Sequence, residues 1–318
     1  MLEQLQFGSD GQIRTKVETG IQMLRAFEPP EGYFLANSGG KDSQAVRKLA
    51  KLAGVKHDDH YNVTGLDAPE TVRFLISQYD TVVYMINDKP DRMYTTHGKR
   101  LLTRADHEEG DVIYFHLPKK SMWELIPERK MPPTRKVRYC CEELKETNGA
   151  GRFTLTGVRR GESSNRKINQ GLITIPTAGK KVKKELDNLG VNFTKTKRGG
   201  VVLNYDDDPD RRITEYCIRT GKALINPLAD WTEEDVWEFI RDEPHCCLYD
   251  EGFSRCGCLG CPMGGYKNRM KEMERWPYIR KLYLKSFEKL LKARKTEGLP
   301  CENWETPEDV MRWWLEDR

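Results

Sequence analysis

The feature that most constrains this chain is an alternation of apolar runs and helix-like segments between residues 33 and 87. Apolar runs occur at 33–39, 60–65 and 81–87, and the two segments between them repeat apolar residues at helical spacing. A β-α-β-α-β order implies parallel strands joined by right-handed crossovers, with ligand groups at the carboxyl ends of the strands. The sequence therefore predicts an α/β protein with a doubly wound, mostly parallel sheet.

Later segments extend this sheet and add a further region. Apolar runs at 152–158 and 223–228 read as strands, and 232–243 reads as a helix that begins with a weak capping box. We predict three regions: an N-terminal helical extension (1–32), an α/β domain (33–230) and a cysteine-rich helical lobe (231–318).

Composition excludes some protein classes. With 318 residues and 37% hydrophobic content the chain can bury a core, and it contains no run of 18 apolar residues. Its first residues lack the apolar stretch of a signal peptide. We therefore expect a globular, cytoplasmic protein without a membrane partner. The net charge of +4 is too balanced to establish a polyanionic partner.

The distribution of charge is more informative than its sum. Residues 166–200 contain nine Lys or Arg and two Asp or Glu, and an acidic run follows at 206–210. This pattern predicts an insertion at about 166–210. A solvated loop or small subdomain would explain it, and so would a basic flap that guides DNA, RNA or a nucleotide phosphate.

The segment NSGGKDSQ at 37–44 joins the first predicted strand to the first predicted helix. Its glycines let the backbone approach a ligand, and successive N–H groups at a helix start form an anion-binding concavity. Lys41, Ser38 and Ser43 add charge and hydrogen-bond donors. The segment predicts a phosphate cradle, although it lacks the Walker spacing. A glycine-rich turn with a solvated lysine is the alternative.

Three motifs in succession resemble one known family. SGGKDS (38–43), VTGLDAPET (63–71) and LTGVRRGES (155–163) are similar to the phosphoadenosine phosphosulfate (PAPS) reductase family of the ATP-pyrophosphatase, or adenine-nucleotide alpha-hydrolase, superfamily. The resemblance extends over about 33–265 and implies an adenine nucleotide, either ATP with Mg²⁺ or PAPS or adenylylsulfate (APS). The residues that it implies for this site are Ser38, Gly39, Gly40, Lys41, Asp42 and Ser43 at the phosphates, Asp67 near the adenosine, and Gly157, Arg159, Glu162, Ser163 and Arg166 closing over the nucleotide. Lys41, Asp42 and Arg159 are the candidate catalytic residues.

Nine cysteines suggest a second kind of chemistry. Cys140 and Cys141 lie at a predicted helix start, and Cys258 and Cys261 form a C-x-x-C pair. Both thiolates of such a turn can point at one zinc ion or iron–sulfur cluster. Because the second pair is distant in sequence, the pattern favours a 4Fe-4S cluster. Zinc binding and reduced or redox-active cysteines remain open.

Resemblance to two kinds of family member implies two ligand sets. The cluster-containing adenylylsulfate reductases imply Cys140, Cys141, Cys258 and Cys261. Resemblance to the DNA-phosphorothioation sulfurtransferases, and to phage and bacterial PAPS-reductase-like proteins with YDEG before GCxxCP, implies Cys140, Cys246, Cys258 and Cys261. We favour the second set, with Cys141 as the alternative ligand.

One departure bears on the class of enzyme. Sulfonucleotide reductases of this family carry a nucleophilic cysteine in an ECG-type motif near the C-terminus, whereas the last cysteine here, Cys301, lies in LPCENWETPED. No cationic residue is adjacent to Cys301 in the sequence to activate its thiol.

This departure favours an ATP-pyrophosphatase-type sulfurtransferase. The expected enzyme cleaves ATP to AMP and pyrophosphate and transfers sulfur to nucleic acid, with a cysteine desulfurase or another sulfur or electron donor as partner. The alternatives are a sulfonucleotide reductase that releases sulfite, an ATP-pyrophosphatase without sulfur chemistry, and a non-catalytic nucleotide- or nucleic-acid-binding subunit.

Overall fold

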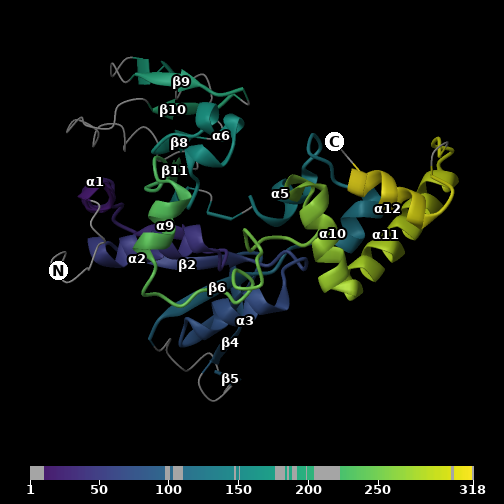
Figure 1. Ribbon diagram of the computed structural model, residues 1–318, viewed down its shortest axis with the longest axis horizontal. Helices are drawn as coiled ribbons and strands as arrows, with labels where there is room; N and C mark the ends of the chain where they lie inside the picture. Colours follow the sequence, from purple (N-terminus) through teal and green to yellow (C-terminus); the bar gives the residue numbers. More distant parts are fainter. Residues whose placement is uncertain are drawn as a thin grey trace. The chain divides into compact units, whose positions relative to one another are not determined.

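A computed structural model shows an α/β protein (Figure 1). The structure describes residues 11–96, 101–102, 110–146, 148–149, 151–175, 183–184, 186–187, 192–197, 199–203, 223–301 and 304–316. They form two compact units, neither of which is continuous in sequence. The first unit contains the described residues within 1–61, 110–114 and 149–246, and the second contains those within 62–109, 115–148 and 247–318.

Parallel strands form the centre of the first unit. Its strand order is β2-β1-β7-β11-β8-β10-β9. The four parallel strands are β1 (Tyr33–Ala36), β2 (His57–Asn62), β7 (Phe153–Leu155) and β11 (Ala223–Ile225). Register pairs Leu35 with Asp59 and with Leu155. The predicted α/β class with parallel central strands is confirmed.

The basic insertion contributes strands to the same sheet. The three strands are β8 (Ile173–Ile175), β9 (Phe193–Lys195) and β10 (Val201–Leu203). They pair antiparallel, β8 with β11 and with β10, and β10 with β9. The described part of this segment therefore extends the sheet, which neither reading of its charge pattern had predicted. Residues 204–210, including the acidic run, lie outside the described residues.

The helices of the first unit are α1 (Gly11–Ala26), α2 (Lys41–Ala53), α6 (Ser164–Asn169) and α9 (Glu233–Phe239), with the 3-10 turn η2 (Arg160–Glu162). Helix α2 repeats Ala45, Leu49 and Ala53 on its buried side and ends at Gly54, whose φ of 69° is the left-handed cap that glycine favours. Side chains from α1, α2, α9 and the central strands share one apolar core.

The second unit combines a β-hairpin with a group of helices. Its strands are β3 (Thr81–Ile86), β4 (Lys89–Thr95) and β5 (Leu101–Leu102), paired antiparallel, and β6 (Val112–His116) has residues in both units. Its helices are α3 (Pro69–Ser77), α4 (Met122–Arg129), α5 (Tyr139–Leu144), α10 (Gly265–Arg275), α11 (Pro277–Thr296) and α12 (Pro307–Glu316), with the 3-10 turn η3 (Pro262–Gly264).

Helices α10, α11 and α12 lie together, as Figure 1 shows, and α4 packs on α11. Helix α11 begins with Pro277, which suits a first helical position because it lacks an N–H. It buries Ile279, Tyr283 and Phe287, which are four residues apart. Trp314 of α12 is fully buried, and its ring centroid lies 4.5 Å from that of Tyr283. Within the described part of the chain, no helix combines the length and apolarity needed to span a bilayer.

Candidate functional site

The predicted phosphate loop lies between β1 and α2, at the carboxyl end of a buried parallel strand. Asn37 continues the strand pairing, since its N–H donates to the His60 carbonyl at 2.8 Å. Its side-chain Oδ1 then accepts from Gly39 N–H at 3.0 Å. Gly39 has a φ of 73°, which L side chains rarely adopt, so the glycine is required by the turn.

Two serines fix the other side of the loop. Ser43 Oγ donates to the Gly40 carbonyl at 2.8 Å and accepts from Ser38 N–H at 3.2 Å. The two hydroxyl oxygens lie 3.3 Å apart. Gly40 is the N-cap of α2, and no side chain caps the helix start. The loop therefore has a preformed shape, with a helix start that suits an anion.

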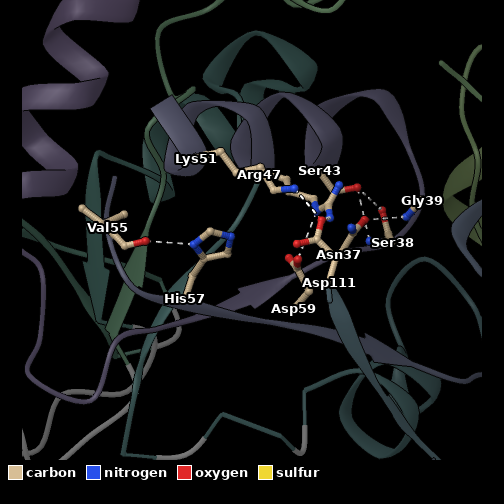
Figure 2. A network of polar contacts seen from close by, with 10 residues as sticks. All are labelled: Asn37, Ser38, Gly39, Ser43, Arg47, Lys51, Val55, His57, Asp59 and Asp111. Carbon is tan, nitrogen blue, oxygen red and sulfur yellow. Dashed lines mark hydrogen bonds and ion pairs between the residues drawn. The ribbon is translucent and has the colours of Figure 1, made fainter. Parts of the chain in front are cut away.

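Salt bridges beside the loop anchor α2 to the sheet, as Figure 2 shows. Arg47 Nε donates to Asp59 of β2 at 3.1 Å, and Arg47 Nη2 reaches Asp111 at 2.6 Å. Lys51 Nζ also donates to Asp111, at 2.6 Å. Although burial acts to raise the pKa of Asp111, these two cations lower it below its usual value.

Lys41 lies in a different environment from a solvated loop lysine. The residue is only 3% exposed, its Nζ is 3.3 Å from Glu233 Oε1 of α9, and it lies 5.9 Å from the centre of the Trp237 ring. The alternative of a solvated lysine is therefore wrong. Sequence reasoning missed Glu233 and Trp237, because neither lies in a motif that resembles a nucleotide site.

The first and third predicted motifs meet in the first unit. Arg159 is 6% exposed, and its Nε donates to Asp42 Oδ1 at 2.6 Å. Gly157 lies against the start of α2, since a Cβ built at this position would be 2.8 Å from the Asp42 backbone. Glycine at 157 is therefore what allows the segment after β7 to approach the loop.

The remaining predicted residues of the third motif form a short network. Arg159 N–H donates to Glu162 Oε1 at 2.9 Å, and Glu162 also pairs with Arg166. Ser163 is the N-cap of α6, with its Oγ accepting from Arg166 N–H at 3.2 Å. Lys41, Arg159 and Arg166 are thus each paired with a carboxylate of the chain.

Asp67, which was predicted near the adenosine, belongs to the second unit. Its Oδ2 accepts from Thr64 N–H at 3.0 Å and from Thr64 Oγ1 at 2.7 Å. Asp67 also forms an isolated antiparallel β-bridge with Cys258. The second motif therefore packs directly against the C-x-x-C turn.

Four of the predicted thiols gather in the second unit. Cys140 interacts with Cys141 through a hydrogen bond and with Cys261 and Cys258 electrostatically, and together with burial these contacts raise its pKa. A hydrogen bond from Cys140 and the Arg138 guanidinium, whose Nη2 is 3.0 Å from Cys141 Sγ, lower the pKa of Cys141 to about 6.

Hydrogen bonds to buried residues fix the C-x-x-C turn. Gly260 N–H donates to Glu272 Oε2 at 2.7 Å, Tyr283 Oη donates to the Leu259 carbonyl at 3.0 Å, and Leu259 N–H donates to the Leu66 carbonyl at 2.7 Å. Cys258 itself interacts with Lys145, and burial raises its pKa despite that cation.

Cys246 is fully buried and belongs to the first unit, whereas Cys140, Cys141, Cys258 and Cys261 belong to the second. Among the described residues, no three His, Cys, Asp or Glu side chains are already arranged to hold a metal ion. The four thiols of the second unit have the donor chemistry for an iron–sulfur cluster, but they would have to close around it. Both predicted ligand sets remain predictions.

Comparison with known proteins identifies the family. The model of the phosphoadenosine phosphosulfate reductase domain matches residues 32–263, which include the loop, all three motifs and the C-x-x-C pair. The chain belongs to the PAPS reductase family. The resemblance seen in the sequence is confirmed.

Curated relatives in this family match short regions. An adenosine 5'-phosphosulfate reductase of Allochromatium vinosum is 43% identical over 49 residues, covering 15% of this chain and 19% of that protein. A phosphoadenosine 5'-phosphosulfate reductase of Gloeobacter violaceus is 44% identical over 53 residues, covering 15% and 22%. The chain thus spans about a fifth of the length of these relatives.

Two other matches are longer and more distant. An uncharacterized protein of Methanocaldococcus jannaschii is 23% identical over 251 residues, covering 76% of this chain and 44% of that protein. A crystal structure of PAPS reductase from Candida auris in complex with phosphate has a TM-score of 0.39 and 14% identity, covering 79% of this chain and 96% of the other.

Proposed function

We propose that this PAPS reductase-family protein is an enzyme that binds ATP at the 38–43 loop, cleaves it to AMP and pyrophosphate, and couples the cleavage to sulfur transfer. The observation that carries the nucleotide site is the pairing of Arg159 with Asp42 at 2.6 Å. This contact joins a buried guanidinium of the third motif to the first turn of α2. The N-cap of that helix is Gly40, so no side chain occupies the helix start. Such a site suits a polyphosphate.

The proposed reaction has two displacement steps. An acceptor oxygen attacks the α phosphorus of ATP, the α–β anhydride bond breaks, and pyrophosphate leaves with the bonding electrons. Hydrosulfide then displaces AMP from the adenylated acceptor, leaving sulfur in place of oxygen. Lys41 and Arg159 would exchange their carboxylate partners for phosphate oxygens and stabilise the charge that develops. Mg²⁺ would accompany the triphosphate, and Asp42 is the carboxylate that the loop offers it.

The thiols of the second unit support the sulfur-transfer half of the proposal. Cys140, Cys258 and Cys261 are common to both predicted ligand sets, and Cys141 interacts with Cys140 in the same unit. We therefore now favour Cys141 over Cys246 as the fourth cysteine. A 4Fe-4S cluster held by three of these cysteines would leave one iron open to hydrosulfide, whereas a cluster held by all four would serve structure or electron transfer. A cysteine desulfurase or a similar donor would provide the sulfur.

The basic segment supports nucleic acid as the acceptor. Lys183 and Lys184 are described, and Lys183 Nζ donates to the Gly199 carbonyl at 2.8 Å, whereas Lys180 and Lys181 lie outside the described residues. If these lysines contact phosphates, replacing all four by Gln should lower the salt dependence of DNA or RNA binding by up to about four counterion equivalents. An unchanged salt dependence would remove nucleic acid from the proposal.

Sulfonucleotide reduction is the second candidate, because curated relatives carry the names APS reductase and PAPS reductase. A reductase needs a thiolate that attacks the sulfate sulfur. Cys301 lies in the loop after α11, where its thiol contacts the Leu299 carbonyl at 3.6 Å.

The two candidates differ in their substrate and product. Incubation with α-labelled ATP and, separately, with PAPS or APS plus thioredoxin distinguishes them. AMP and pyrophosphate from ATP support the sulfurtransferase, and thioredoxin-dependent sulfite release supports the reductase.

A further inference from the structure

A basic hollow lies in the second unit between α4 and α5. Its volume is about 350 Å³, and three cations line it, Arg129, Lys136 and Arg138, together with one carboxylate, Glu142. It is formed by the segment that leads into Cys140 and Cys141, and it belongs to neither the phosphate loop nor the C-x-x-C turn. No step of the proposed reaction uses it.

Hydrogen bonds fix the walls of this hollow. Thr134 N–H donates to the Val137 carbonyl at 3.0 Å, and Val137 N–H donates to Thr134 Oγ1 at 3.0 Å, which closes a turn around Lys136. Tyr139 Oη donates to the Met131 carbonyl at 2.8 Å. The hollow is thus bounded by an ordered turn and by a buried tyrosine, so its shape does not depend on long surface side chains alone.

The cations of the hollow are only partly balanced by the chain, since Glu142 lines it and Arg138 is attracted electrostatically by Glu146 and Cys141. Arg129 is paired with Glu143 at 2.6 Å. Lys136 and Arg138 form no ion pair with any carboxylate among the described residues. Other arginines do form such pairs, among them Arg47, Arg129, Arg152, Arg159, Arg160, Arg166 and Arg275. Arg138 Nε is buried without an acceptor, although its Nη2 contacts Cys141 Sγ. A buried N–H without a partner is costly.

We propose that this hollow binds a small tetrahedral dianion, of the sulfate, thiosulfate or phosphate type, between Lys136 and Arg138. A planar guanidinium binds such an anion with paired N–H groups, and a nearby ammonium adds charge. The same guanidinium donates to Cys141 Sγ, so a bound anion lies beside that thiol. A sulfur oxyanion bound there would lie next to the four thiols of the second unit. The choice of a sulfur oxyanion rests on the proposed function, whereas anion binding itself does not.

The proposal is tested by calorimetric titration of the purified protein with sodium sulfate, sodium thiosulfate or sodium phosphate at constant ionic strength. The double variant Lys136→Gln/Arg138→Gln should bind the tightest of the three at least about tenfold more weakly than the unsubstituted protein, because two charge-assisted contacts are lost. Lys281→Gln is the matched control. Lys281 is an exposed lysine of the same unit, and its replacement breaks no ion pair among the described residues.

The variant Gly40→Val distinguishes anion binding at the phosphate loop from anion binding in the hollow, because this substitution should leave the hollow intact. If the anion still binds the double variant with unchanged affinity and is lost in Gly40→Val, the hollow is not the site and the proposal is overturned. Absence of binding to the unsubstituted protein at millimolar anion overturns it as well. Both results can be read whether or not the protein cleaves ATP, so failure of the proposed function would leave this test valid.

Discussion

Arg159 and Asp42 form a short ion pair, with Arg159 Nε donating to Asp42 Oδ1 at 2.6 Å. One residue follows a strand and the other begins a helix, and the pair joins two motifs that are far apart in the sequence. Because Arg159 is almost fully buried, its guanidinium needs an anionic partner in every state of the protein. Exchange of Asp42 for a phosphate group would satisfy that need.

Replacing Arg159 by Gln should therefore weaken ATP binding by about tenfold or more, because a charge-assisted contact is lost. The matched control is Arg152→Gln, which removes another arginine of the first unit that pairs with a carboxylate, Asp58, at 2.7 Å. Isothermal titration calorimetry with ATP compares the two variants. Equal affinity of both would show that Arg159 does not contact the nucleotide.

Gly157→Ala should disturb the same site by steric overlap. The added Cβ would lie 2.8 Å from the Asp42 backbone, so the strand-following segment or the helix start has to move. We expect a loss of about 1–3 kcal/mol in the free energy of unfolding, as for other overpacked positions, and weaker ATP binding.

The control for this substitution is Gly161→Ala, because nothing lies within 4 Å of a Cβ built at Gly161. Thermal denaturation and ATP titration should leave this variant close to the unsubstituted protein. If Gly157→Ala behaves in the same way, the close approach between the two motifs is not essential.

Much of this site could be predicted from the sequence because its chemistry is local. The glycines, lysine and serines of 38–43 are adjacent in the chain, and the alternation of strands and helices places them at a strand end. Glu233 could not be predicted as the partner of Lys41, because the contact depends on how α9 packs against α2. Gly157 was predicted from the resemblance, but its physical role became clear only from its distance to Asp42.

The sheet was predicted less completely. Strands β1, β7 and β11 lie in the predicted apolar runs, whereas β8, β9 and β10 lie in a segment dominated by charge. The pairing of β8 with β11 and with β10, and of β10 with β9, depends on long-range contacts that a local pattern does not reveal. The hairpin partner β4 was missed for a related reason, because its sequence KPDRMYT is mostly exposed and polar.

Glu272 should give the protein a measurable pH dependence of stability. Burial raises the pKa of its carboxyl group above the usual value, although Gly260 N–H and nearby arginines act against that shift. The folded state therefore holds the proton more tightly than the unfolded chain. The resulting stabilisation is complete below the ordinary glutamate pKa of about 4.5 and is lost as pH rises through the folded-state pKa.

Glu272→Gln should remove this component while keeping an oxygen that can accept from Gly260 N–H. Urea unfolding at a series of pH values should show a smaller fall in stability with rising pH for the variant than for the unsubstituted protein. Parallel pH profiles would mean that Glu272 has the same pKa in both states.

The cysteine substitutions Cys141→Ser and Cys246→Ser decide between the two predicted ligand sets. If the second unit holds the cluster, anaerobically purified protein should be brown, and Cys141→Ser should lose iron and sulfide while Cys246→Ser retains them. Cys258→Ser is the positive control, since Cys258 is in both sets. Iron loss in Cys246→Ser but not in Cys141→Ser would instead support the ligand set with Cys246 that the sequence favoured. Stoichiometric zinc in colourless protein would contradict an iron–sulfur centre.

The most direct test of the central claim is a product assay with α-labelled ATP, a nucleic-acid acceptor and sulfide, using the anaerobically purified protein. We predict AMP and pyrophosphate in equal amounts, with formation strongly lowered in Arg159→Gln and retained in Arg152→Gln. Absence of both products from ATP, together with sulfite release from PAPS or APS in the presence of thioredoxin, would contradict the claim and establish a sulfonucleotide reductase.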